Sequence, residues 1–424
     1  MNIEKYVSQV VKDAKTASRA VASAGDVAKN AALNNIADGI IAATVMLKSE
    51  NEKDVQAAQK AGLSEAIIDR LRLTDSRIKA MADGVRQIIG LPNPVGQIIS
   101  GHTRPNGLQI QKIRVPIGVI VIIYESRPNV TADAAALCLK AGNAVILRGG
   151  KESIYSNIAI YRILASALEK AGLDKRCIQI IEVVEREAVD YLLKADKYVD
   201  VVIPRGGESL IRAVVEKSTI PVIKHYKGVC HTYVDEFANL KQAEDVCLNA
   251  KAQRPATCNA METMLVHEKV APVFLKSMAI RLKEAKVEIR GCDRTCAILR
   301  REASPVNSTN ATDEDFYNEY LDLILNVKVV NSLDDAMLHI ATYGSNHSDA
   351  IITENVNHAL KFTREVDSAA VYVNASTRFT DGFEFGMGAE IGISTDKLHA
   401  RGPMGLEELT SYKFVVFGNG QLRK

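Results

Sequence analysis

An α/β protein with a doubly wound parallel sheet is the fold class that the sequence predicts, and two observations support it. Between Pro116 and His225, short apolar runs alternate with longer segments of helical character. Gly142 and Gly172 directly follow two of those segments, where a left-handed residue commonly ends a helix. Such alternation is typical of successive βαβ units on a parallel sheet. We expect strands at 118–124, 144–148, 177–181, 199–204 and 221–225, separated by helices at about 131–141, 153–171, 187–195 and 208–217.

The region before this sheet is predicted to be helical. Residues 1–90 are rich in Ala, Leu, Ile and Lys, and their apolar residues recur at spacings of three and four. Breaks are expected near Gly25, Ser49 and Gly62, so the region should form several amphipathic helices. Further on, residues 108–115 alternate apolar and polar side chains, which predicts an extended, half-exposed strand.

A second α/β region is expected after about residue 230. It should contain helices at about 268–286, 332–342 and 355–365 and strands at 349–353 and 369–373. The polar segment 303–315 is interpreted as a loop. Residues 412–417, YKFVVF, predict a terminal strand with little room to pair inside a domain. We therefore expect it to join a sheet in another subunit of a homo-oligomer, a dimer or a tetramer.

Composition excludes several classes of partner. The 53 Lys and Arg residues nearly balance the 51 Asp and Glu residues, so no strong field favours nucleic acid or a membrane surface. No stretch approaches the length of a membrane span, and the first residues lack the apolar core of an export signal. Seven cysteines without disulfide-framework spacing fit a reducing cytoplasm best. Cys292 and Cys296 are too widely spaced for a CxxC metal site, so none is expected.

Cys258 is the candidate nucleophile because it lies in an unusually punctuated stretch, QRPATCNAMETMLV (253–266). Pro255 breaks the preceding element, and residues 260–266 continue as a regular apolar segment. A thiol at the opening of a helix would lie at the positive end of the helix dipole, which favours the thiolate. The alternative is that Cys258 is a small buried hydrophobe. Cys230 and His231 form a rival pair, but neighbours in a strand point to opposite faces.

Two loops carry paired glycines between a strand and a helix, at 148–151 and 205–208. Backbone N–H groups at a helix start bind anions, and glycine allows a phosphate to approach the backbone closely. Neither GxGxxG nor GxxxxGK[ST] occurs in this sequence. The loops are therefore interpreted either as phosphate sites or simply as tight turns.

Four stretches together resemble the gamma-glutamyl phosphate reductase family of the aldehyde dehydrogenase superfamily: PIGVIVIIYESRPNVTADAAALCLKAGNAVILRGGKES, VVIPRGGESLI, HYKGVCHTYVD and AKAQRPATCNAMETMLV. The resemblance runs from about residue 110 to the C-terminus. It implies NADPH-dependent reduction of L-glutamate 5-phosphate to L-glutamate 5-semialdehyde, with release of phosphate, in proline biosynthesis. It also implies an aldehyde dehydrogenase-like fold, in which Cys258 is acylated and Asn129 helps to hold the oxyanion. Asn129 would also be suited to cap a helix.

The resemblance also implies a set of cofactor residues. Arg148 aligns with the superfamily lysine near the ribose hydroxyls, and Gly206 and Gly207 would lie near the pyrophosphate. Glu319 resembles the glutamate that holds the nicotinamide ribose, although its spacing from the cysteine is shorter than usual. Lys151 stands where NAD-preferring relatives often carry a glutamate. A lysine should attract a ribose 2′-phosphate, so we predict NADP(H) over NAD(H).

The general-base glutamate of hydrolytic aldehyde dehydrogenases is missing, because HYKG (225–228) stands in its place. A water-activating base would hydrolyse the thioacyl enzyme, so its absence favours reduction. His225 is either a base or a bystander that satisfies local hydrogen bonds. The substrate carries a phosphate and a carboxylate, and Arg127 and Arg254 are the candidate cations, with surface-facing arginines as the alternative.

The resemblance and the pattern together predict three parts. Residues 1–99 and 116–230 would bind NADP, 231–400 would form the catalytic domain, and 100–115 with 401–424 would form an oligomerisation arm. A complex with glutamate 5-kinase would hand over the unstable acyl phosphate. Two other functions remain open: a CoA-acylating aldehyde dehydrogenase, and a thiol hydrolase or nucleotide-binding protein without redox chemistry.

Overall fold

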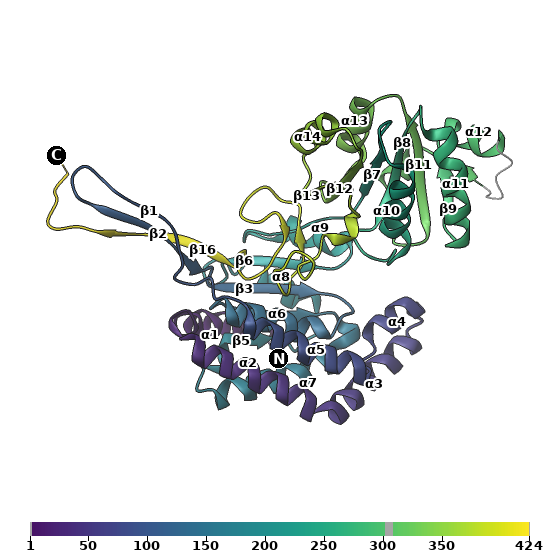
Figure 1. The fold of residues 1–424 in the computed structure, drawn as a ribbon. Helices are drawn as coiled ribbons and strands as arrows, with labels where there is room; N and C mark the ends of the chain where they lie inside the picture. Colours follow the sequence, from purple (N-terminus) through teal and green to yellow (C-terminus); the bar gives the residue numbers. More distant parts are fainter. Residues whose placement is uncertain (1, 302–307, 424) are drawn as a thin grey trace. The chain divides into compact units, whose positions relative to one another are not determined.

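The computed structural model describes residues 2–301 and 308–423, which form two compact units. The first unit comprises residues 1–224, 386–392 and 404–424, and the second comprises 225–385 and 393–403. Figure 1 shows the elements of each unit. In the described part of the chain, no helix combines the length and the apolar character that crossing a bilayer requires.

The first unit contains a four-stranded parallel sheet in the order β5-β4-β3-β6. The chain moves outward from β3 through β4 to β5 and then returns to the other side of β3, which is the doubly wound arrangement that the sequence predicts. Every residue of β3 and β4 is buried, so their apolar runs lie inside the sheet. The strands are β3 (Val119–Tyr124), β4 (Ala144–Gly149), β5 (Ile178–Ile180) and β6 (Val201–Arg205).

Helices connect these strands close to the predicted positions. Gly142 and Gly172 end two of them with φ of 75° and 73°, which confirms the left-handed turns. The fifth predicted strand, 221–225, is instead a single parallel bridge between Val202 and Val222, because Pro221 has no N–H to continue a ladder. The helices are α6 (Asn129–Lys140), η1 (Lys151–Ser153), α7 (Ile154–Lys170), η2 (Lys175–Cys177), α8 (Arg186–Leu192) and α9 (Glu208–Lys217).

The N-terminal helices pack against this sheet and its helices, and one predicted break is wrong. The chain breaks at Ala43 and not at Ser49, since the Thr44 hydroxyl donates back to the carbonyl of Ile41 and competes with the helical ladder. Breaks near Gly25 and Gly62 are confirmed. The helices are α1 (Ile3–Ser23), α2 (Asp26–Ala42), α3 (Thr44–Lys60), α4 (Glu65–Leu71) and α5 (Asp75–Gly90).

A three-stranded antiparallel arm extends from this unit. It consists of β1 (Ile98–Thr103), β2 (Gln109–Pro116) and β16 (Thr410–Phe417), in the order β1-β2-β16. The expectation that 412–417 joins only another subunit is wrong, because β16 pairs with β2 of its own chain along eight residues. The sequence predicts a half-exposed strand at 108–115, but not that residues 410–417 return to pair with it.

The second unit contains a seven-stranded parallel sheet in the order β10-β9-β11-β8-β7-β12-β13. Figure 1 shows α13 and α14 on one side of this sheet and α11 and α12 on the other. Strands 349–353 and 369–373 and the helices near them are confirmed within two residues or fewer. The strands are β7 (Cys230–Val234), β8 (Met261–His267), β9 (Glu288–Gly291), β10 (Ser308–Asn310), β11 (Ile324–Val330), β12 (Ser348–Ile352) and β13 (Ala370–Val373).

The remaining elements complete this unit. Of the predicted loop 303–315, residues 303–307 lie outside the described residues, whereas 308–310 form a strand parallel to β9. A small antiparallel pair joins β14 (Ile393–Ser394) and β15 (Gly402–Pro403). The helices are α10 (Leu240–Ala252), α11 (Ala271–Glu284), α12 (Asp293–Arg301), η3 (Glu314–Tyr317), α13 (Leu333–Tyr343), α14 (Val356–Glu365) and η4 (Thr377–Phe379).

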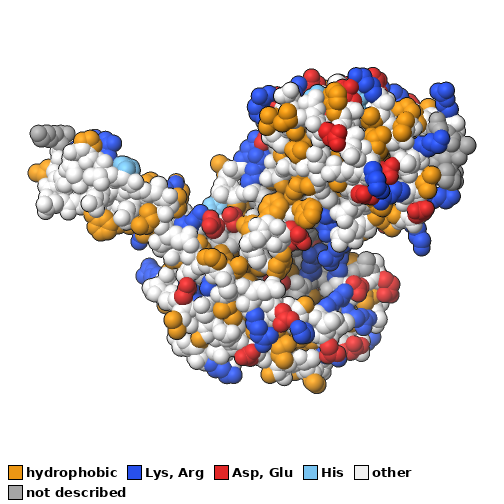
Figure 2. Space-filling view, in the orientation of Figure 1, with side chains coloured by type: hydrophobic (Ala, Val, Ile, Leu, Met, Phe, Trp, Pro, Cys, Tyr) orange, Lys and Arg blue, Asp and Glu red, His pale blue; other side chains and the backbone are white. Residues whose placement is uncertain are grey.

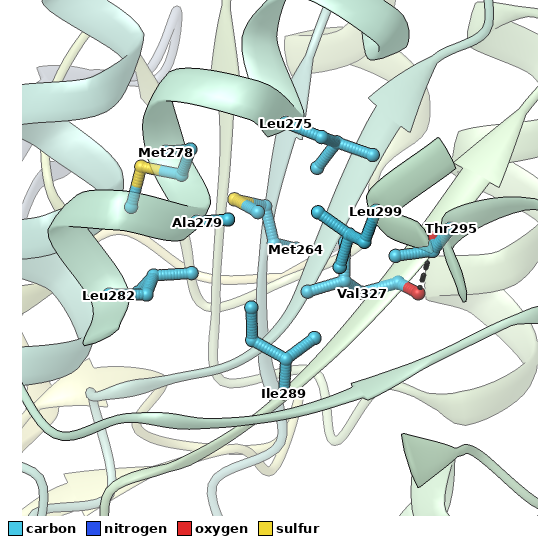
Figure 3. Close-up of a pocket in the computed structure, with 9 residues that line it drawn as sticks. All are labelled: Met264, Leu275, Met278, Ala279, Leu282, Ile289, Thr295, Leu299 and Val327. Atoms are coloured by element: carbon cyan, nitrogen blue, oxygen red, sulfur yellow. Dashed lines mark hydrogen bonds between the residues drawn. The ribbon is translucent and has the colours of Figure 1, made fainter. Parts of the chain in front are cut away.

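Apolar side chains fill both faces of this second sheet. Met264 of β8 points into the cluster formed with α10, α11 and α12, and its neighbour Leu265 points into the opposite cluster with α13 and α14. Figure 3 shows the first cluster, in which the Thr295 hydroxyl donates to the Val327 carbonyl at 3.0 Å. These side chains leave no room for a water molecule, so the space is packed core and not a ligand pocket.

Candidate active site

Cys258 lies in a turn that leads into β8, not at the start of a helix. Residues 261–267 form a strand in which every residue is buried, because both faces of the sheet are covered. A short apolar run of this kind fits a central strand and a buried helix equally well, and the helical interpretation was wrong. The positive end of a helix dipole therefore plays no part at this thiol. Cys258 itself is partly exposed, as a nucleophile must be.

Three segments fix the backbone around Cys258. The Cys230 thiol donates to the Cys258 carbonyl at 3.2 Å, and the Thr377 hydroxyl donates to the Asn259 carbonyl at 2.8 Å. Gly228 lies so close that a Cβ added to it would be 1.9 Å from the Cys258 carbonyl oxygen. Only glycine permits this approach, so β7, the residues before it and η4 together position the turn.

Arg378 of η4 is a residue that sequence reasoning missed. Its guanidinium Nη1 donates to Oδ1 of Asn259, and its Nε donates to Oε1 of Gln253 at 3.0 Å. Burial lowers the pKa of Arg378, the charge of Arg254 lowers it further, and the proximity of Cys258 opposes this shift. Two arginines therefore lie within electrostatic range of each other near the thiol. In the sequence, the only local indication of such a role was that Arg378 follows the predicted strand 369–373, in an irregular segment.

Cys230 and His231 do point to opposite faces of β7. The Cys230 thiol lies 3.7 Å from Nδ1 of His347, whereas Nδ1 of His231 lies 2.9 Å from the Asp349 carboxylate. Burial raises the pKa of Cys230 well above its usual range, so this thiol stays protonated at neutral pH. The two residues form no catalytic dyad.

Three further predicted residues belong to the same unit as this turn. Oε1 of Glu319 accepts a hydrogen bond from the Gly228 N–H at 2.9 Å, which brings Glu319 beside the residue that contacts Cys258. The ring of His225 lies edge-on to the ring of His347, with 5.9 Å between centroids. Arg254 is exposed, and its carbonyl accepts a hydrogen bond from the Thr257 hydroxyl. The cofactor role of Glu319, the substrate role of Arg254 and the possible general-base role of His225 remain predictions.

The other predicted residues belong to the first unit, at the carboxyl ends of its strands. Asn129 begins α6, two residues after Arg127, and its Nδ2 donates to the Asp133 carboxylate at 2.9 Å. Burial raises the pKa of Asp133 to about 6. Arg148 is buried at the end of β4, where its guanidinium donates to the carbonyls of Gly149 and Val184. Desolvation lowers the pKa of Arg148.

The glycine loop before α9 already holds a carboxylate. Oε2 of Glu125, which follows β3, accepts a hydrogen bond from the Gly207 N–H at 2.9 Å. A Cβ added to Gly206 would lie 2.3 Å from the same oxygen, so the space exists only because residue 206 is glycine. The loops after β3 and β6 flank the point where the strand order reverses, which is where such sheets bind ligands. The donors suit an oxyanion, and Glu125 stands in for one.

The second glycine loop is arranged differently. Lys151 is exposed in η1, while the neighbouring Glu152 accepts hydrogen bonds from the N–H of Ser126 at 2.6 Å and from its hydroxyl at 2.9 Å. These bonds join the loop after β4 to the loop after β3. Neither Glu125 nor Glu152 was a predicted site residue, because sequence spacing does not show which loop a carboxylate reaches.

Comparison with known proteins identifies the family. The sequence model of the aldehyde dehydrogenase family matches residues 4–301. A gamma-glutamyl phosphate reductase of Thermodesulfovibrio yellowstonii is 54% identical over 424 residues, covering all of both chains. One of Carboxydothermus hydrogenoformans is 56% identical over 417 residues, which is 98% of this chain and 99% of that protein. The crystal structure of the Thermotoga maritima gamma-glutamyl phosphate reductase has a TM-score of 0.95 at 45% identity, covering 99% of this chain and 100% of that one.

The chain belongs to the aldehyde dehydrogenase family and, within it, to the gamma-glutamyl phosphate reductases. It is therefore an oxidoreductase of that family. The predicted fold class and the family resemblance are both confirmed.

Proposed function

We propose that this enzyme reduces L-glutamate 5-phosphate to L-glutamate 5-semialdehyde, using NADPH and releasing phosphate, as a step of proline biosynthesis. The observation that carries the proposal is the partly exposed Cys258 in a turn fixed by three other segments, in a chain similar over its full length to gamma-glutamyl phosphate reductases. A thiol held in this way is suited to covalent catalysis, because its backbone does not have to be ordered during the reaction.

The chemistry follows from the thiol. The Cys258 thiolate attacks the acyl carbon, the bond to the phosphate oxygen breaks, and a thioacyl enzyme remains. The backbone N–H of Cys258 and the amide of Asn129 stabilise the oxyanion of the tetrahedral species. When bound, NADPH supplies the hydride that reduces the thioester. The resulting thiohemiacetal collapses to the aldehyde and returns the thiolate. No glutamate stands at 225–228 to activate water, so hydrolysis does not compete.

The cofactor would be held mainly by residues of the first unit. The N–H of Gly207 and the space at Gly206 fit a pyrophosphate oxygen, which would displace the carboxylate of Glu125. Arg148 and Lys151 would lie near the adenosine ribose, and Glu319 of the second unit would hold the nicotinamide ribose. The Gly207 N–H already binds an anionic oxygen, that of Glu125, and this supports the assignment of the loop to the pyrophosphate.

Phosphate dependence is the test of this function. Glutamate semialdehyde and NADP should give reduced cofactor only when phosphate, or arsenate as its mimic, is present. Reduction that depends on CoA would instead support a CoA-acylating aldehyde dehydrogenase. Absence of cofactor turnover would support a thiol hydrolase or a nucleotide-binding protein. Of these outcomes, only phosphate-dependent reduction is consistent with the proposal.

Lys151 should set the preference for NADP over NAD. The ammonium group is exposed and available to a ribose 2′-phosphate, so Lys151→Glu should lower the ratio of kcat/KM values for NADP and NAD by about tenfold or more. The measurement is steady-state kinetics with both cofactors. The control is Lys170→Glu, an equal change of charge at an exposed position on α7. Equal kcat/KM for the two cofactors in the unaltered enzyme would contradict the assignment.

The arm and the larger segments have the following proposed roles. Residues 1–99 and 116–230 would bind NADP, residues 231–400 would carry the catalytic cysteine, and 100–115 with 401–424 would join subunits. The arm supports this because it exposes apolar side chains, which Figure 2 shows along its surface and which include Ile98, Phe414 and Phe417 at 59%, 63% and 54% exposure. A second copy of the chain would cover them.

A further inference from the structure

Arg378 is tied directly to the residue that follows the nucleophile. Its Nη1 donates to the side-chain oxygen of Asn259, and the Asn259 amide donates in return to the carbonyls of Arg378 and Thr380 at 3.3 and 2.9 Å. Asn259 is 5% exposed, so this exchange of hydrogen bonds is shielded from water. The guanidinium is therefore held in one place beside Cys258.

The guanidinium keeps a donor for a ligand. Nε and Nη1 donate to Gln253 and Asn259, and among the described residues Nη2 has no acceptor. Arg378 is only partly buried, so a substrate can reach it. An arginine that is fixed by two hydrogen bonds and has an open Nη2 is preorganised to bind an oxyanion.

The electrostatics favour an anion with more than one charge. Arg254 and Arg378 repel each other, since the charge of Arg254 lowers the pKa of Arg378. Burial is the largest cause of the lowered pKa of Arg378. The Cys258 thiol, the Asp381 carboxylate and the Cys230 thiol act in the opposite direction. A phosphate carries close to two negative charges at neutral pH and relieves the repulsion more than a carboxylate does.

The chemistry of the substrate separates its two anionic groups. The phosphate is bonded through one oxygen to the carbon that Cys258 attacks, whereas three carbons separate that carbon from the α-carboxylate. A cation anchored to Asn259, the neighbour of Cys258, is therefore suited to the phosphate. As the bond to phosphate breaks, negative charge grows on the leaving oxygen, where a fixed guanidinium stabilises it most.

We propose that Arg378 binds the phosphate group of the acyl phosphate beside Cys258, and binds inorganic phosphate at the same position in the reverse reaction. This proposal rests on the function proposed above and adds the residue that selects the phosphorylated substrate. Arg254 is the second cation of this site. The α-carboxylate of the substrate would be bound elsewhere.

The test compares Arg378→Gln and Arg378→Lys with the unaltered enzyme in the reverse direction. With glutamate semialdehyde and NADP saturating, Arg378→Gln should raise the KM for phosphate at least about tenfold, because a charge-assisted hydrogen bond is lost. Arg378→Lys, which keeps the charge but not the forked donors, should give an intermediate value. The KM values for semialdehyde and for NADP should change less than about twofold, since neither ligand is bound through this charge.

A second readout excludes a role that is only structural. Phosphate should slow alkylation of Cys258 by iodoacetamide in the unaltered enzyme, and this protection should be lost in Arg378→Gln. Without phosphate, Arg378→Lys should be alkylated at a rate similar to that of the unaltered enzyme, because the charge near the thiol is kept. Arg364→Gln is the control, since Arg364 is exposed on α14 and pairs with Glu365. It should leave all three KM values and the protection unchanged.

Three results would overturn the proposal. An unchanged KM for phosphate with a raised KM for semialdehyde would assign Arg378 to the α-carboxylate. A changed alkylation rate of Arg378→Lys without phosphate, together with a loss of kcat and no selective change in KM, would show that Arg378 only holds the turn. If the unaltered enzyme reduces NADP without phosphate, the proposed function itself fails, and this is seen before any variant is measured.

Discussion

Cys258→Ala should abolish turnover and leave cofactor binding intact. Loss of the nucleophile removes the covalent route, so kcat should fall by about 10⁴-fold or more. Most of the proposed cofactor residues belong to the first unit, and Cys258 is not one of them, so the dissociation constant for NADPH should change less than about threefold. Steady-state rates and a fluorescence titration with NADPH measure the two effects.

Cys292→Ala is the matched control for this prediction. Cys292 is the other partly exposed cysteine of the second unit, and its thiol lies 3.4 Å from the Thr295 hydroxyl, at the start of α12. It should keep near-normal turnover. Residual activity of Cys258→Ala near that of the control would exclude the thioacyl route, as would mass spectrometry that finds the acyl group on a different cysteine.

Lys251→Met should cause the largest loss of stability. Nζ of Lys251 on α10 lies 2.7 Å from Oε2 of Glu262 on β8, and both side chains are fully buried. Removing one partner of a buried ion pair leaves an uncompensated charge, which costs about 3–5 kcal/mol. Urea unfolding followed by circular dichroism should show this as a lower midpoint for the second unit.

The loss should also depend on pH. Burial raises the pKa of Glu262 to about 7 despite the neighbouring ammonium, and removing Lys251 should raise it further. The folded state then binds a proton that the unfolded state, with an ordinary glutamate pKa, has released. Stability should therefore decrease as pH rises toward the folded pKa, so Lys251→Met should be more destabilised at pH 8 than at pH 6.

Two further variants show whether the loss of stability comes from the unpaired buried charge or from the loss of the lysine side chain. Lys251→Met combined with Glu262→Gln removes both charges and keeps an acceptor for the Leu321 N–H, so it should recover most of the lost stability. Lys269→Met breaks an ion pair with Glu236 at the surface and should change the unfolding midpoint little, because solvent screens exposed pairs. A double variant as unstable as Lys251→Met would show that packing, and not charge, is responsible.

Local patterns were sufficient for most of the fold. The buried runs of β3 and β4 were recognisable as parallel strands because longer helical segments alternate with them, as in βαβ units. Gly142 ends its helix at a positive φ that other residues rarely adopt. The turn around Cys258 was recognisable from Pro255 and the polar residues beside it. The prediction of a helix at 260–266 was wrong for a physical reason. A short apolar run is too short to show the periodicity that would distinguish a buried helix from a central strand.

By itself, the sequence determined the doubly wound sheet, the second α/β region, the family and the cysteine on which the chemistry is proposed to depend. These follow from periodicity and from motifs whose residues are close in the chain. Only the tertiary structure decided that β16 pairs with β2, that Glu125 occupies the Gly207 amide and that Arg378 bonds to Asn259. Each of these contacts joins residues more than 80 positions apart, and no local preference specifies a partner at that separation.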